Sequence, residues 1–211
     1  MKSAVILISG GGSNMRALAE ARTGLDIRAV VSNVPEAKGL EWARSQGIAT
    51  QVVDHRKFPD RESFDAALQQ AIGNPDYLLL AGFMRILTAG FIERFERRML
   101  NIHPSLLPAF TGLHTHRRAL EAGVKVHGCT VHFVTRELDN GPIVIQGVVP
   151  VLPGDTEEKL SARVLETEHR IYPQAARWLA QGRLRFTPRG TVEVADAAPR
   201  VEPLLSPAEE R

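Results

Sequence analysis

The chain of 211 residues has one cysteine, few aromatic side chains and no long hydrophobic run. Because Cys129 is alone, no disulfide can form within the chain, and a reducing, cytoplasmic location is expected. No stretch approaches the roughly 18 apolar residues that span a bilayer, so no membrane partner is expected. The 26 basic and 24 acidic residues nearly balance, which disfavours a nucleic-acid partner but leaves room for a small anionic substrate.

Hydrophobic residues make up 44% of the chain and charged residues 24%, which is typical of a globular protein with a sizeable core. The simplest organisation is one domain over residues 1–190. The N-terminal apolar run is too short for a signal peptide and leads straight into glycines. We therefore expect it to form a first β-strand.

Apolar runs bounded by turn residues alternate with helical patterns along most of the chain. This alternation predicts an α/β fold, with a mostly parallel twisted sheet and helices on both faces. Strands are expected at residues 4–9, 27–33, 48–53, 76–82, 98–103, 127–134 and 143–149. Helices are expected at residues 14–22, 36–46, 61–72, 88–95, 114–122 and 156–181.

The last predicted helix has signals at both of its ends. Asp155 and Thr156 are cap candidates, Gly182 fits its end, and Pro173 is expected to kink or divide it. Residues 184–186 and 192–194 flank a turn and predict a small hairpin. Residues 195–211 are expected to form a flexible C-terminal tail, because they contain prolines and few large apolar groups.

Three glycines, at positions 10–12, follow the first strand and open a helix. Free backbone N–H groups and the positive end of a helix favour a bound phosphate there, although a plain tight turn is the alternative. Met15 stands where a dinucleotide fingerprint has glycine, and no Gly-Lys-Ser/Thr ending follows. The second strand ends at Asn33 rather than at an acidic residue, so NAD is disfavoured.

Asn101 and His103 lie two residues apart on a predicted strand. Their side chains should share one face, about 6 to 7 Å apart, while Ile102 faces the core and Pro104 ends the strand. An amide beside an imidazole offers an oxyanion donor and a general acid or base, as acyl transfer to an amine requires. Asp139, in a turn between two apolar strands, can reach the same edge and hold His103 in its charged form.

Each of these three residues also has a purely structural interpretation. Asn101 can satisfy a loop backbone, His103 can be a core histidine, and Asp139 reads as a turn aspartate. Their joint occurrence beside two proline-containing motifs favours the functional interpretation.

Taken together, these motifs resemble the folate-dependent formyltransferases, and most closely the branch that acts in purine synthesis. The resemblance covers residues 3–186 and is carried by residues 8–14, 81–87, 101–108, 112–117, 127–134 and 138–142. It implies a single-domain, Rossmann-like formyltransferase fold. It also implies transfer of the formyl group of 10-formyltetrahydrofolate, a co-substrate, to the amine of 5-phosphoribosylglycinamide in de novo purine biosynthesis, without a metal.

The resemblance assigns roles to individual residues. The catalytic trio matches Asn101, His103 and Asp139. The segments that bind the substrate phosphate and ribose match Gly12, Ser13, Asn14 and Glu168. The folate-binding positions match Arg61, Met84, Arg85, Ile86, Leu87, Asn101, Thr135, Arg136, Glu137 and Leu138.

Two positions depart from the family pattern. Leu165 stands where the family has a polar glutamine one turn before Glu168, so one substrate hydrogen bond is in doubt. Thr111 replaces the usual proline or lysine, in a loop over residues 105–126 that is expected to be mobile until substrate binds.

Other readings of the sequence compete with formyl transfer. A metal site is the weakest, because no closely spaced cysteine or carboxylate completes the set His114, His116, His127 and His132. A hydrolase that releases formate from the same folate and a tRNA-directed formyltransferase usually carry a further domain, for which this chain is expected to have no room. A non-catalytic mononucleotide-binding module has no need of the catalytic trio. A monomer or weak homodimer is expected.

Overall fold

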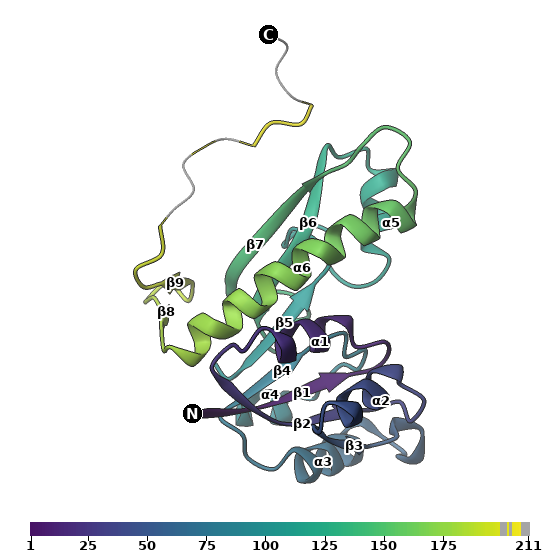
Figure 1. Cartoon of the computed structure of the whole chain (residues 1–211), viewed down its shortest axis with the longest axis vertical. Helices are drawn as coiled ribbons and strands as arrows, with labels where there is room; N and C mark the ends of the chain where they lie inside the picture. Colours follow the sequence, from purple (N-terminus) through teal and green to yellow (C-terminus); the bar gives the residue numbers. More distant parts are fainter. Residues whose placement is uncertain (199–201, 203, 208–211) are drawn as a thin grey trace.

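Seven strands form one twisted sheet in the computed structural model, which describes residues 1–198, 202 and 204–207 (Figure 1). The strand order is β3-β2-β1-β4-β5-β6-β7. The first five strands pair in parallel, whereas β6 runs antiparallel to both β5 and β7. The strands are β1 (Lys2–Ile8), β2 (Leu25–Ser32), β3 (Ala49–Val52), β4 (Tyr77–Leu80), β5 (Met99–His103), β6 (Val126–Phe133) and β7 (Ile143–Pro150).

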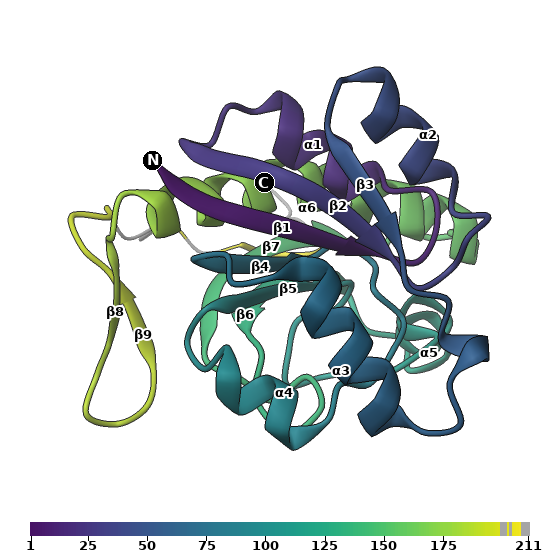
Figure 2. The same ribbon diagram turned by 90° about the horizontal axis from the view of Figure 1, so that it is seen from below.

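Helices cover both faces of this sheet, as Figure 2 shows from below. One face carries α1 (Ser13–Glu20), α2 (Lys38–Ser45), α5 (Thr115–Glu121) and α6 (Glu157–Ala180), and the other carries α3 (Arg61–Ile72) and α4 (Ala89–Arg94). Alternation along β1 builds both cores, because Ile6 faces the α6 side and Leu7 the α3 side. A 3-10 turn that the sequence did not predict, η1 (His55–Lys57), lies between β3 and α3.

The sheet reverses its winding between β1 and β4. The chain leaves β1 towards α1 on one face and leaves β4 towards α4 on the other, so the two loops diverge at the carboxyl ends of these strands. In open α/β sheets such a switch point is where ligands bind. The carboxyl end of β5, which carries Asn101 and His103, lies next along the same edge.

The long helix α6 crosses the sheet diagonally in Figure 1. Thr156 is its N-cap and accepts from the Lys159 N–H, as expected. At its other end, Gly182 adopts a φ of +67°, while Gly182 N donates to Leu179 O and Arg183 N to Trp178 O. These two bonds form a Schellman motif, so the predicted role of Gly182 is confirmed. Pro173 lies inside α6 and does not divide the helix.

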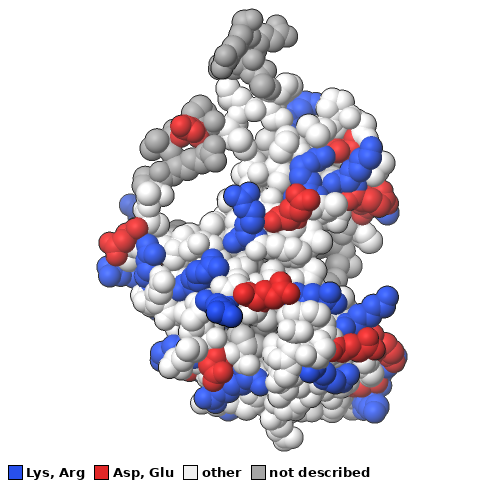
Figure 3. Space-filling model, viewed as in Figure 1, with Lys and Arg blue, Asp and Glu red and all other residues white. Residues whose placement is uncertain are grey.

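The observed elements agree with the predicted ones to within about two residues. The predicted hairpin is present as β8 (Leu184–Phe186) and β9 (Val192–Val194). The predicted tail falls partly outside the described residues, at 199–201, 203 and 208–211. Among the described residues, no helix is both long and apolar enough to cross a membrane. Acidic and basic side chains are interspersed over the face drawn in Figure 3.

Candidate functional site

The predicted phosphate turn lies between β1 and α1. Gly12 is the N-cap of α1 and has a φ of +73°, a left-handed conformation that disfavours a side chain. A Cβ on Gly12 would lie 3.0 Å from the Gly39 Cα, so the start of α2 packs directly against the turn. Gly10 and Gly11 have open space around them. The turn therefore presents backbone to solvent at the positive end of a helix, where an anion is stabilised.

A buried hydrogen bond joins this turn to α6. Asn14 Nδ2 donates to Glu168 Oε2 over 2.6 Å, and both residues are less than one-tenth exposed. Burial raises the pKa of Glu168 to about 7, and the Asn14 bond opposes that rise. The structure thus brings together two of the residues predicted to bind phosphate and ribose, 154 positions apart in the chain.

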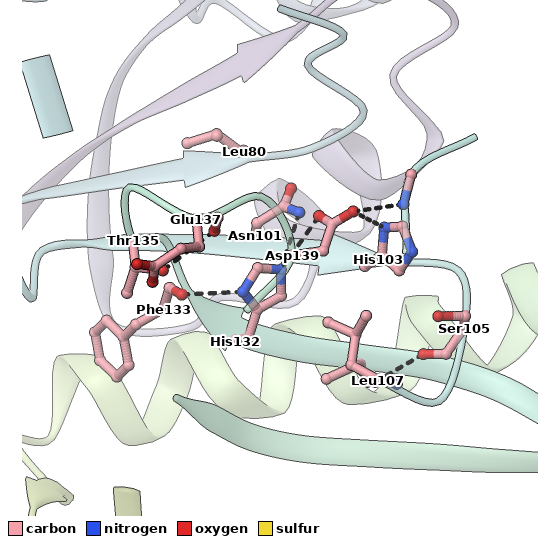
Figure 4. Close-up of polar contacts among 12 residues, drawn as sticks. Leu80, Asn101, His103, Ser105, Leu107, His132, Phe133, Thr135, Glu137 and Asp139 are labelled. Carbon is pink, nitrogen blue, oxygen red and sulfur yellow. Dashed lines mark hydrogen bonds and ion pairs between the residues drawn. The ribbon is translucent and has the colours of Figure 1, made fainter. Parts of the chain in front are cut away.

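The predicted catalytic trio meets at the end of β5 (Figure 4). Asp139 Oδ2 lies 3.5 Å from His103 Nδ1, and both side chains are less than one-tenth exposed. Asp139 adopts a φ of +52°, an uncommon backbone conformation outside glycine. His103 Nε2 lies 3.0 Å from the Phe110 carbonyl oxygen. Both ring nitrogens of His103 therefore face hydrogen-bond acceptors.

A third histidine orients the Asn101 amide. Asn101 and His132 are directly opposite in the antiparallel β5–β6 pair, and their Nδ2 and Nε2 atoms lie 3.2 Å apart. His132 Nδ1 lies 2.9 Å from the Phe133 carbonyl oxygen, so this nitrogen donates and Nε2 accepts from the amide. Burial lowers the pKa of His132, which agrees with the neutral ring. One Asn101 N–H is thereby held by His132, and the other has no hydrogen-bond partner among the described residues.

The loop after β5 covers the His103–Asp139 pair in this structure. In addition to the Phe110 carbonyl at His103, Gly112 N donates to Asp139 Oδ2 over 2.8 Å. The near end of the loop is tied to the sheet, because Thr130 Oγ1 donates to Ser105 O and accepts from Leu107 N. For His103 Nε2 to reach a substrate, the Phe110 carbonyl has to move away.

The predicted folate segments lie in the loops after β4 and β6, the two strands that flank β5. In the loop after β4, Met84 is 63% exposed and Ile86 52%, whereas Leu87 is buried. In the loop after β6, Leu138 is 58% exposed and Arg136 pairs with Glu93 of α4. Thr135 Oγ1 donates to the carbonyl of Glu137, so these two residues shape their own loop. Arg61 is the first residue of α3 and is exposed.

The two residues that depart from the family pattern, Leu165 and Thr111, lie on α6 and in the loop before α5. Leu165 is half-buried on α6. The Thr111 carbonyl accepts from Arg118 Nη1 over 2.5 Å, which links this loop to α5.

Sequence reasoning missed several residues that shape the site. It considered His132 as a candidate metal ligand and missed its bond to Asn101, which depends on the β5–β6 register. It also missed Ser9, whose hydroxyl accepts from Met84 N over 2.7 Å and donates to Asn33 Oδ1. Ser9 therefore ties the glycine turn to the loop after β4.

The four histidines considered for a metal do not converge. His127 Nε2 and His116 Nδ1 lie 3.2 Å apart, while His132 serves Asn101. Burial, with His116 adding to it, lowers the pKa of His127 to about 4. Within the described part of the chain, no group of three or more histidine, cysteine or acidic side chains is arranged to hold a metal ion.

Comparison with known proteins identifies relatives over nearly the whole chain. Residues 1–176 match the formyl transferase family. Phosphoribosylglycinamide formyltransferase of Escherichia coli K12 is 50% identical over 188 residues, which cover 86% of this chain and 89% of that protein. The trifunctional purine biosynthetic protein adenosine-3 of Gallus gallus is 45% identical over 193 residues, which cover 89% of this chain but 19% of that longer protein. The crystal structure of glycinamide ribonucleotide transformylase 1 from Symbiobacterium toebii has a TM-score of 0.88 and 48% identity, with 93% of this chain and 95% of that one covered.

Proposed function

Because the chain belongs to the formyl transferase family, we propose that it transfers the formyl group of 10-formyltetrahydrofolate to the amine of 5-phosphoribosylglycinamide. The products are the N-formyl compound and tetrahydrofolate, in de novo purine biosynthesis. The observation that carries the proposal is the contact of Asp139 with His103, beside Asn101 and on the same sheet edge as the glycine turn. The expected setting is the cytoplasm, with the protein a monomer or weak homodimer.

The substrate phosphate is proposed to bind at Gly12, Ser13 and Asn14, where the N-cap residue Gly12 offers no side chain to cap the first N–H groups of α1. Glu168 is proposed to accept from the ribose hydroxyls, since its bond to Asn14 holds it beside the turn. This arrangement directs the amine of the same molecule along the sheet edge towards β5.

Asn101 and His103 are proposed to act on the formyl oxygen. The amine attacks the formyl carbon, a new C–N bond forms, and the oxygen becomes negatively charged. The free N–H of Asn101 and a ring N–H of His103 donate to this oxyanion. Asp139, in contact with His103, is proposed to assist transfer of the amine proton to the folate nitrogen, which leaves as its bond to the formyl carbon breaks.

The residues present fit a pterin ring. The exposed side chains of Met84, Ile86 and Leu138 offer apolar surface that a planar ring would cover. The loops after β4 and β6, which carry these three residues, are proposed to enclose the ring. The other predicted folate-binding residues of these two loops are Arg85, Leu87, Thr135, Arg136 and Glu137. Arg61 is proposed to contact the folate glutamate from α3.

Folate deformylation, followed with and without 5-phosphoribosylglycinamide, tests the proposal against its alternatives. We expect turnover of 10-formyltetrahydrofolate only when the amine is present. Turnover without the amine would indicate the hydrolase. A protein that binds the phosphorylated substrate but turns over neither compound would be a mononucleotide-binding module.

A further inference from the structure

The 83–88 loop, which joins β4 to α4, is held by a side chain at each end. At its start, Met84 N donates to Ser9 Oγ over 2.7 Å. At its end, Thr88 N donates to Asp65 Oδ2 over 2.6 Å. Between these bonds Leu87 is buried, while Met84 and Ile86 face solvent. The two bonds therefore fix the segment whose exposed side chains are proposed to meet the pterin.

Asp65 is an unusual residue for its position on α3. It is only 3% exposed and lies between Phe64 and Leu68, both of which pack into the core. Its second oxygen, Oδ1, is buried and finds no hydrogen-bond partner among the residues described. Burying a carboxylate opposes folding unless its bonds repay the lost hydration, so an apolar residue would serve packing better here. The short bond to Thr88 N is the feature that accounts for an acid at this site.

The neighbouring residue on α3 touches the same loop. The Arg85 guanidinium carbon lies 5.8 Å from the centre of the Phe64 ring, a cation–π geometry. Phe64 and Asp65 thus contact the loop at successive residues, one beneath Arg85 and one at Thr88. A change in the position of α3 at this point would be transmitted to the exposed side chains of the loop.

We propose that Asp65 is a positioning residue for the formyl donor, whose carboxylate holds the 83–88 loop in the shape that presents Met84 and Ile86 to the pterin. The proposal rests on the function proposed above. It assigns Asp65 to one substrate only, because the phosphate turn and Glu168 lie on the α6 side of the sheet and Asp65 on the α3 side.

The test uses two variants that remove the acceptor, Asp65→Ala and Asp65→Leu, and one that keeps an oxygen, Asp65→Asn. Asp76→Ala is the matched control, because Asp76 also accepts a backbone N–H, that of Ser3 over 2.8 Å, at the opposite end of the sheet. In the Ala and Leu variants we expect the KM for 10-formyltetrahydrofolate to rise about tenfold, the equivalent of one hydrogen bond to a charged group. The KM for 5-phosphoribosylglycinamide should change less than about twofold, and Asp65→Asn should recover most of the loss.

Hydrogen exchange of the 83–88 amides gives a readout that needs no substrate. Exchange should be faster in Asp65→Ala and Asp65→Leu than in the wild type, and unchanged in Asp76→Ala. Unchanged exchange in the loop would overturn the proposal, as would an unaltered KM for the formyl donor or an equal rise in both KM values. An inactive wild-type protein would instead refute the proposed function, and the exchange rates would still decide whether Asp65 positions the loop.

Discussion

At the residue scale, the site is a chain of polar side chains in which each one is oriented by the next. The Phe133 carbonyl fixes the tautomer of His132, His132 fixes the amide of Asn101, and Asp139 faces His103. His132, His103 and the Asp139 side chain are buried and Asn101 is half-buried, and a charge or dipole acts more strongly in such a setting than in water. The proposed chemistry takes place at Asn101 and His103, and Asp139 is proposed to support it through its contact with His103.

Replacing Asp139 with Asn is expected to lower kcat. The carboxylate lies 3.5 Å from His103 Nδ1, and an amide in its place is a weaker hydrogen-bond acceptor for that ring nitrogen. The check is kcat of both proteins with both substrates saturating, and an unchanged kcat would remove Asp139 from the mechanism.

Some of these residues were predictable and others were not. Spacing on a strand and a turn motif were enough to propose that Asp139 reaches His103. The path to this contact was not predictable, because β6 is antiparallel to β5 and the loop after β6 starts beside Met99, at the amino end of β5. The bond between Asn101 and His132 required the β5–β6 register, which no local pattern encodes. The contact of the Phe110 carbonyl with His103 depends on the path of a long loop, which sequence does not specify.

At the element scale, helices and strands were predictable because their boundaries carry local chemistry. Asp60 caps α3 by accepting from Ser63 N, and Thr156 caps α6. Pro173 shows where local rules stop. Helix α6 stays a single element there because its neighbours Tyr172, Ala175 and Ala176 are fully buried against the sheet, so tertiary packing outweighs the missing N–H.

Two glycine substitutions are expected to change stability in opposite directions. Gly182→Ala should lower the free energy of unfolding by about 1 kcal/mol, because its φ of +67° is unfavourable for a side chain even though the space around it is open. Gly90→Ala, also in open space but inside α4 without a positive φ, should raise it by about 0.5 to 1 kcal/mol. Urea unfolding midpoints measure both, and shifts of the same sign would contradict the conformational argument.

At the scale of the whole molecule, two buried groups make stability depend on pH in opposite senses. The folded state depresses the pKa of His127 to about 4, so its contribution is lost as the pH falls from about 6.5 towards 4. The folded state raises the pKa of Glu168 to about 7. The contribution of Glu168 to stability is therefore fully present below about pH 4.5 and is lost as the pH rises through 7. These two pH-dependent contributions to stability partly cancel in the wild type. Removing one of the two groups makes the contribution of the other measurable.

Glu168→Gln should therefore gain stability relative to the wild type as the pH rises from 4.5 to 7.5. The gain should approach about 1 to 3 kcal/mol, because the variant has no carboxyl to ionise while the His127 contribution is common to both proteins. Unfolding free energies at several pH values give the difference. Glu166→Gln, an exposed change two residues away, is the control and should show no such trend. A flat difference for Glu168→Gln would contradict the assigned burial effect.

The central claim is that Asn101 and His103 together stabilise the oxyanion of an amine-dependent formyl transfer, and kcat of His103→Ala tests it most directly. Loss of one oxyanion donor typically lowers the rate by about 10² to 10³, or roughly 3 to 4 kcal/mol. With folding verified by circular dichroism and both substrates saturating, we predict a fall of that size. A His103→Ala protein with kcat within about threefold of the wild type would contradict the account, because removal of a working oxyanion donor lowers the rate far more than that.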